Sequence, residues 1–126
     1  MSNRLSIENF DKLFFACTAI FAHKWQLSII VCLSNGPKYF GEILSYHNGL
    51  SKKVLSTNLH KLESKGVISR HSDTSGKITR VEYSLTKQGK ELIPILESLQ
   101  EWGINYSSLS ADNNYKKSES TISNMH

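Results

Sequence analysis

The side chains best suited to chemistry in this sequence lie on one short segment, residues 49–66. At 3.6 residues per turn, Leu55, Leu59 and Leu62 fall on one side of a helix. The opposite side carries hydroxyl, imidazole and ammonium groups: Lys53, Ser56, Thr57, His60 and Ser64. Such groups can enter a major groove about 12 Å wide and contact base edges and phosphates. The segment therefore predicts a helix that reads double-stranded DNA or, taken alone, an ordinary amphipathic surface helix.

Both ends of this helix are marked. The Ser51 hydroxyl can accept a hydrogen bond from a first-turn amide, which makes Ser51 a good N-cap. Gly66 is a natural residue to follow the last turn, because glycine adopts the left-handed backbone that ends many helices.

Catalytic and metal chemistry lack the residue patterns they need. The five histidines, His23, His47, His60, His71 and His126, have neither the spacing of a zinc site nor cysteines beside them. The chain also shows no Ser-His-Asp arrangement, no phosphate-cradling glycine loop and no carboxylate pair in an apolar setting. We therefore expect a protein that is not an enzyme and has neither a metal nor another cofactor.

Length and charge narrow the class further. A chain of 126 residues can bury one core, so a single domain is expected. The net charge is +4 and the isoelectric point about 9.1. The segment from Ser51 to Lys90 contains nine lysine and arginine residues but only three carboxylates, which gives a local net charge of +6. This distribution favours an anionic partner.

The sequence predicts a cytoplasmic, soluble protein. Cys17 and Cys32 do not form a disulfide framework, and the chain opens without a secretory pattern. The longest apolar run, residues 27–33, is interrupted by Ser28 and is far shorter than the ~20 residues of a membrane span.

Three helices are expected before the reading segment, over residues 7–21, 24–33 and 39–46. The first carries an aromatic-rich stripe that is buried either in the monomer's own core or by a second copy of the chain. The breaker cluster 34–37 ends the second helix, and the turn 47–49 joins the third to the reading helix. This order is that of a helix-turn-helix.

A β-hairpin is predicted directly behind the reading helix. Residues 67–72 and 81–85 are its strands, and 73–77 are its turn. Lys77 near the tip and Arg80 on the outward face would reach phosphates or the minor groove, as the wing of a winged helix does. The alternative is an exposed hairpin with solvated charges.

The chain is expected to end in a long helix and a tail. Thr86 caps a helix that runs to about Tyr106, with Pro94 inside it as a kink. Residues 107–126 lack an apolar period and are expected to form a flexible tail behind a domain of residues 1–106. The fold class is mainly α with a small β-hairpin.

Several short motifs together resemble one family. Their order and spacing, from about Phe14 to Gly103, are similar to those of HxlR-type winged helix-turn-helix regulators, which are relatives of the MarR group. The motifs are Lys24-Trp25, Gly36-Pro37, Phe40-Gly41-Glu42, Gly49-Leu50-Ser51, Leu55, Leu59, Leu62-Glu63, Gly66, residues 81–86, Gly89, Leu92, Pro94 and Glu101-Trp102-Gly103. The resemblance implies a homodimer held by its first and last helices. It also implies binding to a pseudo-palindromic operator and control of transcription, which we expect to be repression.

The resemblance can be applied to individual residues of this sequence. Lys53 and Arg80 coincide with basic positions of the family, while four residues of the reading helix fall at variable positions where operator specificity should differ: Lys52, Ser56, Thr57 and His60. The predicted DNA-binding set is thus Ser51, Lys52, Lys53, Ser56, Thr57, His60, Lys77 and Arg80.

Two questions about regulation stay open in the sequence. Many family members carry a redox-sensing cysteine followed by proline where Lys12 and Leu13 stand here, so Cys17 is the candidate sensor, against a buried structural cysteine. An unknown small-molecule or electrophile effector could also bind between the first and last helices. The rival function is a winged-helix protein-interaction module that does not bind specific DNA.

Overall fold

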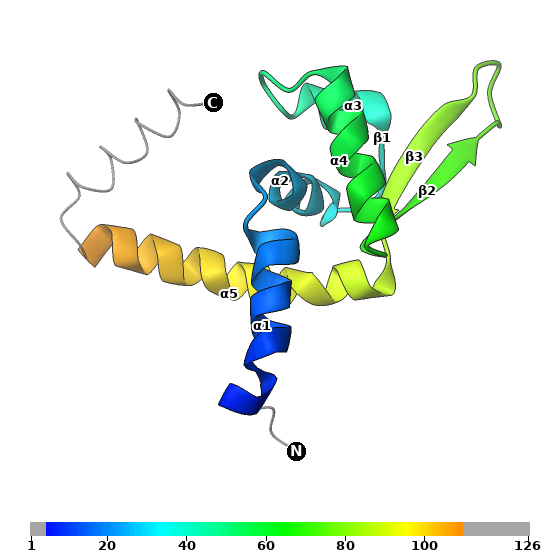
Figure 1. The fold of residues 1–126 in the computed structure, drawn as a ribbon. Coiled ribbons are helices and arrows are strands. Elements are labelled where there is room, and N and C mark those ends of the chain that lie inside the picture. The colour runs from blue at the N-terminus through cyan, green and yellow to red at the C-terminus, as the bar shows by residue number, and fades with distance from the viewer. Residues whose placement is uncertain (1–4, 110–126) are drawn as a thin grey trace. The chain divides into compact units, whose positions relative to one another are not determined.

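The computed structural model describes residues 5–109, and side chains to residue 107 (Figure 1). Its helices are α1 (Phe10–Ala16), α2 (Lys24–Leu33), α3 (Phe40–Ser45), α4 (Lys52–Ser64) and α5 (Lys87–Leu109). Its strands are β1 (Lys38–Tyr39), β2 (Ile68–Asp73) and β3 (Arg80–Leu85). The expected fold class, mainly helical with a small sheet, is confirmed.

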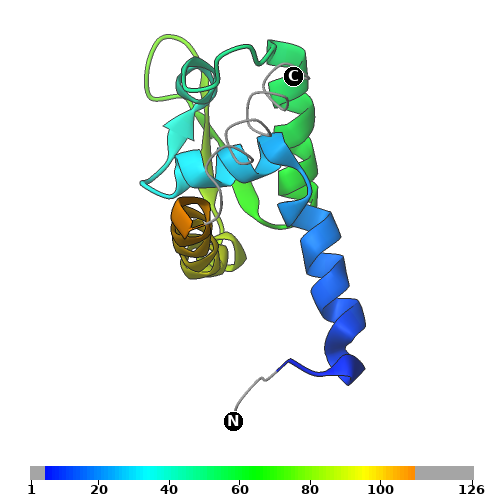
Figure 2. The same ribbon diagram turned by 90° about the vertical axis from the view of Figure 1, so that its left-hand side faces the viewer.

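The first helical segment is not uniform. A 3₁₀ turn, Ile7–Asn9, precedes α1, and a π-helical turn, Cys17–Phe21, follows it. No residue of α1 is buried, and Ile20 is the one residue of the π-helical turn that is. The option that the aromatic stripe lines the monomer's own core is therefore wrong for α1. In Figure 2 this segment projects away from α2 and α4.

The second and third helices lie close to their predicted bounds, but a strand between them was missed. Lys38 and Tyr39 pair with Tyr83 and Glu82 of β3, so the sheet has three antiparallel strands in the order β1-β3-β2. Tyr39, predicted as the first residue of the third helix, is instead its N-cap. The Glu42 carboxylate accepts a hydrogen bond from the Tyr39 amide at 2.8 Å.

Helix α4 begins and ends where the sequence marks it. The Val54 amide donates to the Ser51 hydroxyl at 3.1 Å, as expected of an N-cap. At the other end Gly66 has φ +77°, its amide donates to the Glu63 carbonyl at 3.0 Å, and the Val67 amide donates to the Leu62 carbonyl at 3.1 Å. These bonds form a Schellman motif.

The hairpin is shifted along the chain relative to its prediction. Strand β2 starts at Ile68 rather than Val67 and continues to Asp73, which pairs with Arg80. The turn therefore comprises residues 74–79 and still contains Lys77. Val67 is buried beside α5, where its carbonyl accepts hydrogen bonds from the amide and hydroxyl of Thr86.

One apolar core joins α2, α3, α4 and the sheet. The three leucines of the reading helix are each at most 1% exposed, which confirms the apolar side predicted for it. The other buried apolar residues are Ile20, Ile29, Ile30, Leu33, Ile43, Leu50, Val67, Ile68, Tyr83 and Leu85.

Helix α5 begins after Thr86 as predicted, because the Gly89 amide donates to the Thr86 hydroxyl at 3.1 Å. It runs through Pro94 to Leu109, three residues beyond the predicted end, so residues 107–109 are helical rather than tail. The remainder of the predicted tail, 110–126, lies outside the described residues. The chain divides into two compact units after Lys90, within this helix.

No single helix within residues 5–109 is long and apolar enough to cross a membrane. The segments Ile7–Phe21 and Lys24–Leu33 meet the length and composition requirement only as a pair, and they are bent by 81°.

Candidate nucleic-acid interface

The outward side of α4 carries the predicted reading residues. Lys52, Lys53, Ser56, Thr57 and His60 are all exposed. Positions 53, 56, 57 and 60 follow one another at three- and four-residue steps, so their side chains form one stripe opposite the buried leucines. Ser51 is exposed too, but its hydroxyl already serves as the helix cap, which leaves it the other lone pair and its proton for a phosphate or base.

A polar network that the sequence did not predict fixes α4 on α2. Gln26, only 1% exposed, donates its amide to the Asn58 carboxamide oxygen at 3.3 Å and accepts from the Lys65 ammonium at 2.6 Å. Asn58 in turn donates to the Val54 carbonyl at 2.9 Å. These bonds connect both halves of the reading helix to one buried side chain.

Lys65 also ties α4 to the first helical segment. Its ammonium donates to the carbonyl of Ala19, which lies in the π-helical turn, as well as to Gln26. Burial lowers the pKa of Lys65, and the neighbouring Lys61 lowers it further. In the sequence, the only indication of this network is Gln26, a polar residue within the mostly apolar segment that forms α2.

The turn before α4 is built around His47. His47 is 6% exposed, and its Nδ1 donates to the Ile43 carbonyl at 2.7 Å, which leaves Nε2 to pair with the Ser28 hydroxyl at 2.7 Å. The indole of Trp25 meets the imidazole edge-on at 5.9 Å between centroids. The Leu50 amide then donates to the His47 carbonyl at 3.2 Å. The turn that places the start of α4 is thereby held by α2.

Tyr39 of β1 contacts the two strand ends that flank the hairpin turn. Its hydroxyl donates to the Asp73 carboxylate at 2.6 Å, and the Arg80 guanidinium lies over its ring at 3.5 Å from the centroid. Arg80 was predicted to point outward, and it is exposed, but one face of its guanidinium is stacked on Tyr39. The N–H groups at its edge can still reach a phosphate.

Hydrogen bonding beside the hairpin turn sets the charge of Asp73. The Ser75 hydroxyl at 2.6 Å, the Tyr39 hydroxyl and the Ser75 amide at 3.0 Å all donate to the carboxylate, and they hold the pKa of Asp73 well below its usual range. The same bond to Asp73 raises the pKa of Tyr39. At neutral pH the pair is therefore a phenol and a carboxylate.

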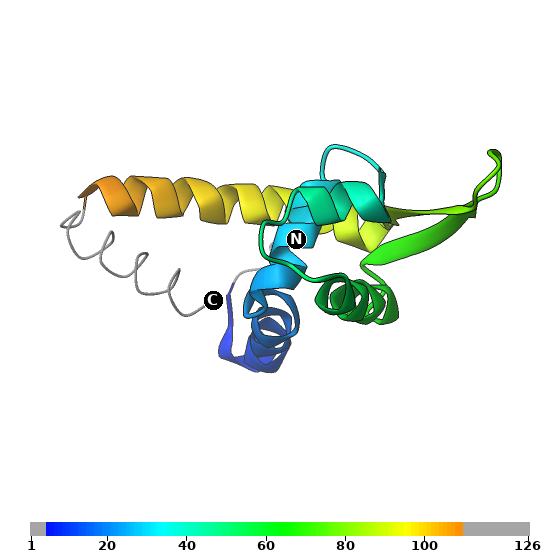
Figure 3. The same ribbon diagram turned by 90° about the horizontal axis from the view of Figure 1, so that it is seen from above.

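The start of α4 and the turn of the hairpin lie on the same side of the molecule, at the top of Figures 1 and 2. Seen from above, the hairpin extends beyond α3 and α4 (Figure 3). Lys77, in that turn, is exposed. One surface thus presents the basic start of the helix and the basic tip of the hairpin.

The remaining candidates lie elsewhere. Cys17 begins the π-helical turn and is half-buried, and both it and Cys32 are free thiols. A redox role for Cys17 stays a prediction. Tyr83 is buried in the core, whereas Trp102 is 64% exposed and stacks on Tyr106. Within residues 5–109 no group of three or more ligating side chains could hold a metal ion.

These features define a winged helix-turn-helix transcriptional regulator: α3, a tight turn and α4 form the reading unit, and β2 and β3 form the wing. The profile of the HxlR-like helix-turn-helix family matches residues 20–111. The chain belongs to this family, whose members are transcriptional regulators rather than enzymes.

Individual relatives agree with this assignment. An HTH-type transcriptional regulator of Methanothermobacter thermautotrophicus is 39% identical over 85 residues, which are 68% of this chain but only 64% of that relative. The regulator YvaP of Bacillus subtilis is 40% identical over 83 residues, 66% of this chain and 76% of that one. A MarR-family regulator crystallised from Enterococcus faecalis V583 superimposes with a TM-score of 0.74 at 32% identity, covering 85% of this chain and 96% of that chain.

Proposed function

We propose that this protein is a homodimeric, sequence-specific DNA-binding repressor that recognises a pseudo-palindromic operator. The observation that carries the proposal is the outward side of α4, where short polar and basic groups occupy one stripe while the opposite side is anchored in the core. A helix held in this way can enter a major groove without losing its support.

The residues divide by role. Lys52 and Lys53 stand in the first turn of α4, and their ammonium groups contact phosphates or base edges. Ser56, Thr57 and His60 offer short hydrogen bonds, and Thr57 adds a methyl group for contact with thymine. Lys77 and Arg80 add wing contacts to the backbone or minor groove.

Dimerisation follows from the unburied α1. Phe10, Leu13, Phe14 and Phe15 are all between 45% and 70% exposed, an apolar patch too large for a solvated helix. A second copy that covers this patch would relate the two α4 helices by a two-fold axis, so that each helix reads one of two half-sites about 34 Å apart. A dimer seated on a promoter excludes other proteins from it, which is the basis of the proposed repression.

Binding to DNA fragments tests the proposal. Duplexes that the purified protein binds are selected from a random-sequence pool. The protein is also titrated into the DNA upstream of its own gene, at physiological salt and in the presence of competitor DNA. We expect Lys53→Ala to weaken binding to all sequences and to reduce the slope of log K against log salt by about one for each lost phosphate contact. Lys90→Ala, which removes an exposed charge outside the reading surface, is the matched control and should bind like the parent.

Sequence preference distinguishes base-specific recognition from non-specific electrostatic binding. Thr57→Ala and His60→Ala should alter the selected half-site while leaving the salt slope unchanged. If the parent selects no sequence, or if both classes of variant bind like the parent, α4 does not read DNA and the domain is a protein-interaction module.

A further inference from the structure

The angle between the first helical segment and α2 depends on a two-residue joint. The segments Ile7–Phe21 and Lys24–Leu33 are bent by 81° where they meet, and Ala22 and His23, the joint, lie between them. The first segment carries the apolar patch proposed for the second copy, and α2 packs on the reading helix α4. The angle at the joint therefore sets how that patch is directed relative to α4.

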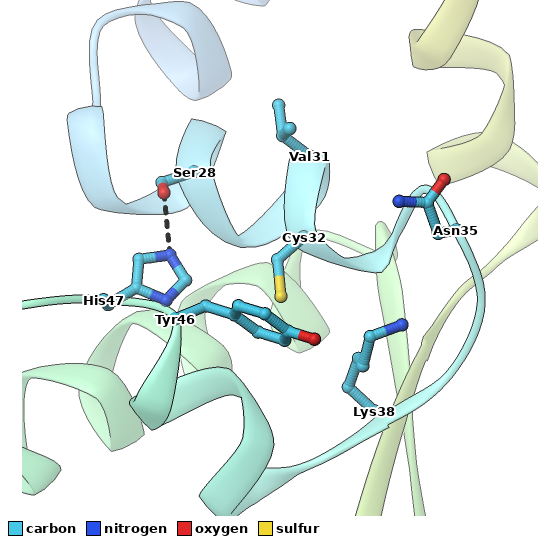
Figure 4. Close-up of a pocket in the computed structure, with 7 residues that line it drawn as sticks. All are labelled: Ser28, Val31, Cys32, Asn35, Lys38, Tyr46 and His47. Atoms are coloured by element: carbon cyan, nitrogen blue, oxygen red, sulfur yellow. Dashed lines mark hydrogen bonds between the residues drawn. The ribbon is translucent and has the colours of Figure 1, made fainter.

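Helices α2 and α4 form one rigid body, because polar links join them near both ends of α4. At its start, the Ser28 hydroxyl pairs with Nε2 of His47 at 2.7 Å, in the turn that leads into α4 (Figure 4). At its end, the Lys65 ammonium donates to the Gln26 carboxamide oxygen at 2.6 Å. The three leucines of α4 are buried in the core, so sliding of α4 on α2 would break close packing.

Lys65 also joins this body to the first helical segment. Its ammonium donates to the carbonyl of Ala19, in the π-helical turn that ends the segment. Carbonyls in the last turn of a helix lack a helical amide donor, and the helix dipole favours a cation there. Ile20 beside it is buried, but apolar burial is non-directional, whereas a charge-assisted hydrogen bond has a preferred direction. Lys65 is thus the side chain placed to hold the angle at the joint.

A small change of this angle matters at the scale of DNA. The nine residue steps from Phe10 to Ala19 correspond to about 14 Å at about 1.5 Å per residue. A tilt of about 15° at the joint would then move Phe10 by about 3.5 Å, close to the rise of about 3.4 Å per base pair. Because the two-fold axis repeats the tilt in the second copy, the two α4 helices would no longer match half-sites at the original spacing.

We propose that Lys65 is a positioning residue: it fixes the direction of α1 relative to α4 and thereby sets the half-site spacing that the dimer accepts. This inference rests on the proposed function, because it requires a dimer joined through α1 and an operator with two half-sites. Lys65 is the C-cap of α4, and the two acceptors of its ammonium, Ala19 and Gln26, lie within the protein. It therefore acts through the joint rather than by contact with bases.

Operators of different spacing test the proposal. Two copies of the half-site selected by the parent are placed on one duplex, with their centres separated by about one helical turn and by one or two base pairs more or less. We expect the parent to bind its preferred spacing at least about ten-fold more tightly than the others. Lys65→Met should reduce this preference to less than about three-fold, while binding an isolated half-site within about two-fold of the parent. Because Lys65→Met also leaves Gln26 with one partner fewer, the readout is the ratio between spacings rather than a single affinity.

Lys61→Met is the matched control, since it removes the same charge one turn earlier on α4 and leaves the bond to Ala19 in place. It should keep the spacing preference of the parent, even if a lost phosphate contact weakens binding to all operators alike. Circular dichroism of both variants checks that they are folded.

Amide hydrogen exchange of the free protein gives a readout without DNA. The joint amides of Ala22 and His23 donate to carbonyls of the first segment at 3.0 and 3.2 Å. Lys65→Met should speed their exchange by at least about five-fold, because the turn opens more often once its bond to Lys65 is lost. The Leu55 amide, which donates to the Ser51 carbonyl at 2.9 Å in the first turn of α4, should exchange at the parent rate.

The proposal is overturned if Lys65→Met keeps the spacing preference of the parent, or if Lys65→Met and Lys61→Met exchange the joint amides at the same rate. A parent without a spacing preference overturns it as well. Equal weakening at every spacing and at the isolated half-site also overturns it, because Lys65 would then support DNA contact rather than spacing. A parent that selects no DNA sequence refutes the proposed function, and faster exchange at the joint would then still assign the hold on α1 to Lys65.

Discussion

Gln26 is the buried polar side chain that links α2 to the reading helix. It is buried, and it links the Asn58 carboxamide to the Lys65 ammonium, which also reaches the Ala19 carbonyl. A neutral polar side chain at this point is stabilising only while both partners are present, because an unpaired buried polar group costs about 1–3 kcal/mol.

Replacing Gln26 with leucine tests this dependence. Gln26→Leu keeps the size of the side chain but leaves Asn58 with one partner fewer, and we expect the free energy of unfolding to fall by about 1–2 kcal/mol. Urea unfolding followed by tryptophan fluorescence measures it. Gln88→Leu, at an exposed position in the first turn of α5, should change stability by less than about 0.5 kcal/mol. Identical unfolding midpoints for the two variants would show that the network contributes nothing.

Asp73 makes the turn end of the wing sensitive to acid. Its pKa is held low in the folded state, so the stabilisation it brings is complete above the unfolded value of about 3.9 and is lost as pH falls below it. We expect Asp73→Asn to lower the melting temperature at pH 6, and we expect the difference from the parent to shrink as pH falls from about 4 to about 2. Glu91→Gln, at an exposed position of α5, is the control and should show no such convergence. A constant difference between parent and Asp73→Asn at all pH values would contradict the assignment.

At the scale of elements, the signals that predicted the fold correctly are local ones. Ser51, Gly66 and the three leucines of α4 lie within one helix, so spacing and capping chemistry are enough to place them. Strand β1 has two residues and exists only because Lys38 and Tyr39 pair with β3, more than forty residues later, so no local pattern announces it. The Gln26 network and the stacking of Arg80 on Tyr39 were missed for the same reason.

Close approach of α5 to the sheet end depends on Gly89. A Cβ at Gly89 would lie 2.2 Å from the Val67 carbonyl oxygen, whereas a Cβ at Gly103 would meet nothing within 4 Å. We expect Gly89→Ala to destabilise the protein by about 1–3 kcal/mol, because backbone must move. Gly103→Ala should stabilise it by about 0.5–1 kcal/mol through helix propensity. Thermal unfolding compares the two, and a stabilised Gly89→Ala would contradict the packing of α5 on Val67.

At the scale of the whole molecule, the proposed dimer depends on α1. This helix buries none of its own residues and exposes three phenylalanines, so the described residues of its own compact unit leave its apolar side uncovered. The Lys65 bond to Ala19 places the base of this helical segment against the reading helix. The surface proposed for the second copy is therefore continuous with the part of the molecule that positions α4.

A charged substitution on this surface tests whether α1 forms the dimer interface, because it should disrupt the dimer and leave the monomer folded. Phe14 is 58% exposed and stacks with Phe10 at 6.0 Å between ring centroids, so Phe14→Glu leaves the monomer core intact but would place a carboxylate in the proposed interface. Sedimentation equilibrium should give twice the 14.3 kDa chain mass for the parent and the monomer mass for Phe14→Glu. Ile78→Glu, at an apolar position 77% exposed in the hairpin turn, is the matched control and should stay dimeric.

Because a monomer can hold only one half-site, Phe14→Glu should also bind a two-half-site operator no more tightly than a single half-site. A parent that sediments as a monomer, or a Phe14→Glu variant that stays dimeric, would remove α1 from the interface.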